Sequence, residues 1–129
     1  MDMLERVKNT KAQGYCCSET VMLLALEDLK KENPDLMKAM VALCGGFGVG
    51  QICGALSAAC AVICMVDEKQ VAKEKTRLEV VDWFKKRYGV LDCPTLTDDN
   101  LDNRPIVCPG ITAETYEFLH GMLSERGLV

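Results

Sequence analysis

Apolar residues recur at intervals of three and four along most of the chain, which is the spacing of one face of an α-helix. Val21, Leu24, Ala25 and Leu29 form one such stripe, and no segment alternates convincingly as a strand would. The pattern predicts helices over residues 2–13, from about 18, over 34–44, 51–66 and 67–88, a short one at Cys93-Pro94, and a last one over 112–126. We therefore expect an all-α protein, a compact single-domain bundle of about six helices.

Two of the predicted segments have distinctive compositions. The run from Gly45 to Gly50 contains four glycines and cannot remain helical, so we expect a glycine-rich loop there. The helix over 51–66 is rich in alanine, so neighbouring helices can approach its backbone closely. In the helix over 67–88 we expect the apolar side to be formed by Val71, Leu78, Val81, Trp83 and Phe84.

Length and charge exclude several classes of protein. The 129 residues, 49% hydrophobic and 26% charged, suit one domain over 1–129 and do not suit a disordered chain. A net charge of −4 with no block of basic residues argues against nucleic acid as the main partner. The longest uncharged apolar stretch, Ile52–Val66, is too short to cross a membrane, and residues 1–13 lack the apolar core of a signal peptide. We expect a cytoplasmic protein without membrane insertion.

Cysteine is the unusual residue, with eight copies in the chain. Four of them, Cys17, Cys53, Cys93 and Cys108, stand at or just before a predicted helix N-terminus. Unpaired backbone N–H groups and the positive end of the helix dipole favour a thiolate at that place. Thiolates attack disulfides and bind metals, so these four residues are the candidate site.

The remaining cysteines have less specific surroundings. Cys60 and Cys64 lie on consecutive turns of the helix over 51–66, close enough to share a metal, but small buried core residues would give the same pattern. No Cys-x-x-Cys pair is present, which argues against a thioredoxin-type dithiol and a zinc ribbon. The roles of Cys16, Cys44, Cys60 and Cys64 stay open.

Four segments, GYCCSETV (14–21), GGFGVGQICGALSAA (45–59), DCPTL (92–96) and the late Cys108, resemble the C_GCAxxG_C_C family, whose members are regarded as redox-active. The family's four cysteines correspond to Cys17, Cys53, Cys93 and Cys108. Its Cys-Gly-Ala-x-x-Gly motif ends here in Ala58 instead of glycine. The resemblance implies bacterial or archaeal redox chemistry, often encoded near transporters, and assigns no reaction.

Three hypotheses follow, and the sequence leaves them open. In the first, the four cysteines hold an iron–sulfur cluster or cycle between dithiol and disulfide; N–H groups of Gly46, Gly48, Gly50 and Gly54 would bind the cofactor. In the second, the same four cysteines bind zinc or copper without turnover. In the third, the thiols are inert core residues. The first implies a redox partner protein or a small-molecule electron donor or acceptor, and a homodimer is compatible with all three.

Overall fold

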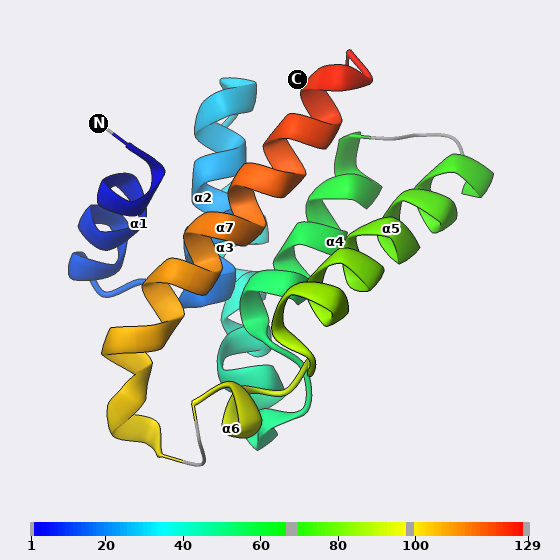
Figure 1. Cartoon of the computed structure of the whole chain (residues 1–129). Coiled ribbons are helices and arrows are strands. Elements are labelled where there is room, and N and C mark those ends of the chain that lie inside the picture. The colour runs from blue at the N-terminus through cyan, green and yellow to red at the C-terminus, as the bar shows by residue number, and fades with distance from the viewer. Residues whose placement is uncertain (1, 67–69, 98–99, 128–129) are drawn as a thin grey trace.

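A computed structural model describes residues 2–66, 70–97 and 100–127, without the side chains of Phe47, residues 70–73, Cys93, Pro94, Leu101 and Arg104 (Figure 1). The predicted all-α class is confirmed, since every regular element in these residues is helical. The α-helices are α1 (Met3–Ala12), α2 (Cys17–Leu29), α3 (Pro34–Met40), α4 (Gly54–Val66), α5 (Gln70–Tyr88), α6 (Cys93–Leu96) and α7 (Arg104–Glu125). Short turns of other helix types are η1 (Val41–Leu43), η2 (Gly46–Gly50) and η3 (Leu101–Asn103).

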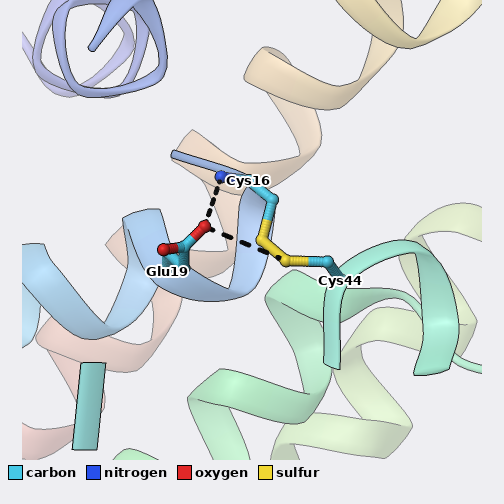
Figure 2. Close-up of side chains that lie close together, drawn as sticks. All are labelled: Cys16, Glu19 and Cys44. Carbon is cyan, nitrogen blue, oxygen red and sulfur yellow. Dashed lines mark hydrogen bonds between the residues drawn. A yellow bond between two sulfur atoms is a disulfide. The ribbon is translucent and has the colours of Figure 1, made fainter. Parts of the chain in front are cut away.

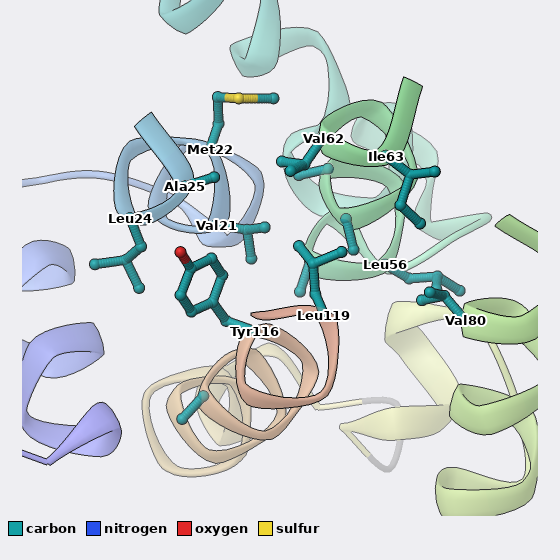
Figure 3. Close-up of a cluster of buried hydrophobic side chains, with 14 of the residues drawn as sticks. Val21, Met22, Leu24, Ala25, Leu56, Val62, Ile63, Val80, Tyr116 and Leu119 are labelled. Carbon is teal, nitrogen blue, oxygen red and sulfur yellow. The ribbon is translucent and has the colours of Figure 1, made fainter. Parts of the chain in front are cut away.

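The core lies where α2, α4 and α7 meet (Figure 3). Val21 from α2, Ile63 from α4 and Leu119 from α7 are completely buried there. Ala55, Ala58 and Ala59 of α4 are also completely buried, so the alanine-rich helix does lie closely against its neighbours, as its composition indicates. Each large aliphatic side chain buried in this way contributes about 1.5–3 kcal/mol to folding.

Two further helices cover this centre. α1 packs against α7, and α5 packs against α4 on the other side of the molecule (Figure 1). The buried face of α5 is formed by Thr76, Val80 and Phe84, at successive intervals of four. The prediction that Leu78 lies on this face is wrong, because Leu78 is 64% exposed. Two positions along a helix correspond to a rotation of about 200°, so a residue midway between Thr76 and Val80 faces away from the core.

Polar side chains fix where several helices begin. The Asp2 carboxylate accepts from the Glu5 backbone N–H at 2.8 Å, and the Asn33 side chain accepts from Leu36 N–H at 3.1 Å. These caps confirm the starts of α1 and α3. At α6 the cap is Asp92, whose carboxylate accepts from the Thr95 backbone N–H at 2.9 Å, so Cys93 is the first residue of this helix, as predicted.

The glycine run forms a wide turn rather than an open loop. α3 ends at Met40, earlier than predicted, and η1 leads into Gly45 and Gly46, both with positive φ. The turn η2 is closed by the Gln51 N–H, which donates to the Gly46 carbonyl at 3.2 Å. A Cβ at Gly46 would lie 2.7 Å from the Gln51 nitrogen and the Ile52 oxygen, so only glycine fits there.

The last helix is longer than predicted. The sequence predicts a start near Thr112, after Cys108-Pro109-Gly110, but α7 begins at Arg104 and continues through Pro109. Pro105 occupies the first turn, where proline is well tolerated, while Pro109 has no N–H to donate to the carbonyl four residues earlier. Cys108 therefore lies one turn inside α7, and its predicted position at a helix N-terminus is wrong.

Candidate functional site

A cavity of about 510 Å³ opens between α1, the starts of α2 and α4, and the first half of α7. We call it the cysteine pocket. Three of the four predicted site residues line it, namely Cys17, Cys53 and Cys108. The fourth, Cys93, begins α6, but its side chain lies outside the described residues. The other lining residues are Lys8, Lys11, Ala12, Tyr15, Cys16, Gly45, Gly54, Leu96, Thr97, Pro105, Pro109, Ile111 and Thr112.

Three different elements bring these cysteines to one pocket. Cys17 is the first residue of α2. The chain reaches it through a turn in which Gly14 has a φ of +101°, a value that favours glycine. Cys53 directly precedes α4, and its N–H donates to the Leu91 carbonyl at 2.7 Å, which ties this end of α4 to the segment before α6. Cys108 comes from α7. The predicted position at a helix start is thus confirmed for Cys17 and Cys53.

The acidity of Cys17 is strongly altered by its neighbours. The Cys108 thiol, which donates a hydrogen bond to the Cys17 sulfur, is the main cause that lowers the pKa of Cys17 to about 5. Burial works in the opposite direction, and the positive charge of Lys11 assists the thiolate. The Lys11 Nζ lies 3.1 Å from the Cys17 Sγ. Cys17 is therefore a thiolate at neutral pH.

Thr112 adds a further polar group to this site. It is completely buried, lines the pocket, and its hydroxyl lies close enough to Cys17 to help lower that pKa. No described residue forms a well-aligned hydrogen bond with this buried hydroxyl. Neither Lys11 nor Thr112 was predicted, because nothing in their sequence surroundings marks them as neighbours of Cys17.

Of the four glycines proposed to bind a cofactor, Gly54 lines the cysteine pocket. Gly46, Gly48 and Gly50 are not among its lining residues. Gly54 also lets α4 approach α2: a Cβ there would lie 3.0 Å from the Leu43 oxygen and 3.4 Å from Ser18. In the described structure its role is close packing next to Cys53.

Cys16 and Cys44 form a disulfide, which the sequence analysis did not predict (Figure 2). The bond joins the N-cap of α2 to the residue after η1, with the two Cα atoms 5.9 Å apart. Their 28-residue separation gave no signal of this proximity. Cys17, the next residue, does not take part in this bond and interacts with Cys108 instead.

Cys60 and Cys64 lie half-buried on α4, away from the pocket lining. Burial raises the pKa of Cys60, although the positive charge of Arg77 partly opposes this effect. The positions of Cys60 and Cys64 are thus compatible with the interpretation that they are small packing residues of α4.

Membrane insertion was not expected, and within the described residues no helix is long and apolar enough to span a bilayer.

Comparison with known protein families identifies a match over most of the chain. Residues 15–122 match a family model described as "Putative redox-active protein (C_GCAxxG_C_C)". No curated protein and no solved structure matches the chain. The family match covers Cys17, Cys53, Cys93 and Cys108, and every residue that lines the pocket except Lys8, Lys11 and Ala12. The chain therefore belongs to the C_GCAxxG_C_C family of proteins, to which redox activity is attributed.

Proposed function

We propose that this protein catalyses thiol–disulfide exchange in the cysteine pocket, with Cys17 as the attacking thiolate and Cys108 as the resolving thiol. The observation that carries the proposal is the contact of the two sulfurs beside Lys11. An attacking group needs thiolate character, and a resolving group must reach the same sulfur. Cys17 and Cys108 meet both conditions.

The reaction balances in two steps. The Cys17 thiolate attacks one sulfur of a substrate disulfide, that S–S bond breaks, and the first substrate thiolate leaves with the proton from Cys108. The Cys108 thiolate then attacks the Cys17 sulfur of the mixed disulfide and expels the second substrate sulfur as a thiolate, which takes up a proton from water. Two electrons pass to the substrate, and the protein retains a Cys17–Cys108 disulfide. A dithiol donor, either a protein or a small molecule, would return the site to its reduced form.

The intermediate in this scheme can be trapped. After brief treatment of the reduced protein with a small organic disulfide, we expect mass spectrometry of peptides to find a Cys17–Cys108 bond. Cys108→Ser should accumulate the mixed disulfide at Cys17, and Cys17→Ser should form neither product. Cys64→Ser serves as the control and should react as wild type does. Equal modification of Cys60 and Cys17 in wild type would contradict the proposal.

A second candidate is electron transfer through an iron–sulfur cluster, favoured by the third cysteine in the same pocket. Two-cysteine exchange does not need Cys53, whereas a cluster needs several thiolates from different elements. Cys17, Cys53 and Cys108 would supply three ligands and Cys93 the fourth, and the cluster would supply one-electron chemistry. Iron and sulfide content of protein purified without oxygen tests this candidate: stoichiometric amounts that vanish in Cys53→Ser would establish it. Zinc or copper bound there instead would indicate a binding protein without turnover.

We also propose that the protein acts in the cytoplasm, the location that the sequence predicts. In a reducing compartment, disulfides are mostly transient and catalytic or regulatory. This supports an exchange function for the pocket and makes the Cys16–Cys44 bond a reducible one.

A further inference from the structure

A second group of reactive side chains adjoins the cysteine pocket, since Cys16 lines the pocket and also belongs to this group. One ligand atom each from Cys16, Glu19 and Cys44 lies within 4.8 Å of the other two. All three residues are half-buried, so small molecules in solution can reach them. Figure 2 shows the Glu19 carboxylate directed toward the two sulfurs. The proposed thiol–disulfide exchange uses none of these three residues.

The carboxylate is held in place independently of the disulfide. The Cys16 backbone N–H donates to the Glu19 Oε1 at 3.1 Å, in the reciprocal cap that begins α2. The same oxygen lies 3.9 Å from the Cys44 Sγ. Because this half of the cap uses the backbone N–H of Cys16, breaking the S–S bond does not remove it. Glu19 therefore remains beside both sulfurs when they are reduced.

The Ser18 hydroxyl, which lies next to both sulfurs, is also held in a fixed position. The Ser18 side chain is completely buried, and its hydroxyl donates to the Met40 carbonyl at 2.8 Å. The Ser18 hydroxyl oxygen lies 3.2 Å from the Cys16 sulfur and 3.6 Å from the Cys44 sulfur. Reduced sulfurs at this place would face each other and Glu19 rather than turn into the core.

We propose that reduction of the Cys16–Cys44 disulfide creates a Zn²⁺ site formed by the two thiolates and the Glu19 carboxylate. A dithiol reductant supplies two electrons and two protons, the S–S bond breaks, and the reductant leaves as its own disulfide. Zn²⁺ then displaces both thiol protons as it binds. Oxidation of the two sulfurs by a disulfide substrate reverses the sequence and releases the ion.

The donor set favours zinc over other metals. Zn²⁺ accepts sulfur and carboxylate oxygen together, whereas Cu(I) prefers sulfur and Mg²⁺ and Ca²⁺ prefer oxygen. Three protein ligands leave the fourth tetrahedral position to water, which is the arrangement of an exchangeable site rather than of a closed structural one. The disulfide and the zinc site exclude each other, since they use the same two sulfurs.

The test is a zinc titration against a chromophoric chelator in the double variant Cys17→Ser/Cys108→Ser, which removes two pocket thiols. We expect the reduced protein to bind one equivalent of Zn²⁺ more than the same protein with the Cys16–Cys44 disulfide intact. Adding an organic disulfide to the zinc form should release that equivalent. Equal zinc content in the two redox states would overturn the proposal.

Variants in the same background locate the ion. Cys44→Ser should lose the redox-dependent equivalent, and Cys60→Ser should keep it. Glu19→Gln retains the disulfide and an amide oxygen for the cap, so its fold is preserved even if Cys44→Ser unfolds. It should weaken zinc binding by about 10–100-fold, the loss typical when even an outer partner of a metal site is removed. Unchanged affinity in Glu19→Gln would show that the three-ligand site is wrong. Because the test needs neither Cys17 nor Cys108, its outcome is independent of the proposed exchange reaction.

Discussion

Cys17 and Cys60 are both half-buried cysteines on helices of the same bundle, yet their acidities move in opposite directions. The pKa of Cys17 is lowered to about 5, whereas burial raises the pKa of Cys60. Cys17 receives a hydrogen bond from Cys108 and lies beside Lys11. Cys60 has Arg77 nearby, but Cys64 on the next turn opposes its ionisation.

The difference shows that burial alone does not make a cysteine reactive. Taking a thiolate out of water disfavours it at both positions, and at Cys17 this penalty is exceeded by a thiol donor and a cation. The donor and the cation come from α7 and α1, so the reactive sulfur requires three helices to meet. At Cys60 a cation from another helix, Arg77 of α5, is present, but no hydrogen-bond donor is among the causes that shift its pKa, which favours a packing role.

The largest expected effect is a selective reaction at acidic pH. At pH 6 most of Cys17 is thiolate and almost none of Cys60 is, so Cys17 should be alkylated first. Low-pKa thiolates are intrinsically weaker nucleophiles, which reduces the advantage to about tenfold. Iodoacetamide labelling followed by peptide mass spectrometry measures this ratio, and the rate at Cys17 should fall by half only near pH 5. Labelling of Cys60 at the same rate would remove the contrast on which the comparison rests.

Removing the thiol donor should give the next largest effect. Cys108→Ala takes away the main cause of the lowered pKa, so the midpoint of the pH–rate profile of Cys17 should rise by at least about one pH unit, or about 1.4 kcal/mol. Cys64→Ala is the matched control and should leave the midpoint unchanged. If both variants behave as wild type does, Cys108 is not the partner of Cys17.

Removing the cation should have a smaller effect in the same direction. Lys11→Met eliminates a charge whose contribution is second to the Cys108 hydrogen bond, so the midpoint should rise by less than in Cys108→Ala. Lys8 also lines the pocket but is not among the groups that shift Cys17, so Lys8→Met is the control. A larger shift in Lys8→Met than in Lys11→Met would contradict the described geometry.

The smallest expected effect is a loss of stability from a substitution next to Cys53. Gly54→Ala places a methyl group 3.0 Å from the Leu43 oxygen, which should lower the free energy of unfolding by about 1 kcal/mol. The start of α4 must shift, while Cys60, almost two turns further along, should keep its labelling rate. Urea denaturation and thiol labelling of the same variant measure both results. Gly110→Ala, where nothing lies within 4 Å of the added Cβ, is the control substitution.

Local signals in the sequence predicted much of this arrangement. Periodicity and caps located the helices, and the predicted positions of Cys17 at the start of α2 and of Cys53 just before α4 are confirmed. Pro109 misled the prediction of α7, because one missing hydrogen bond is tolerated inside a long packed helix. Lys11, Thr112 and the pairing of Cys16 with Cys44 depend on how separate helices pack, and no local pattern records that.

The Cys16–Cys44 bond also closes a covalent ring that contains all of α2 and α3. A closed loop of 28 residues removes conformations from the unfolded chain and stabilises the fold by about 3–4 kcal/mol on the chain-entropy model. The exposed Lys30-Lys31 connection lies inside this ring, so tryptic cleavage there leaves the two pieces joined until a reductant is added. The redox state of one bond thus determines whether a break in the backbone separates the N-terminal quarter of the protein from the rest.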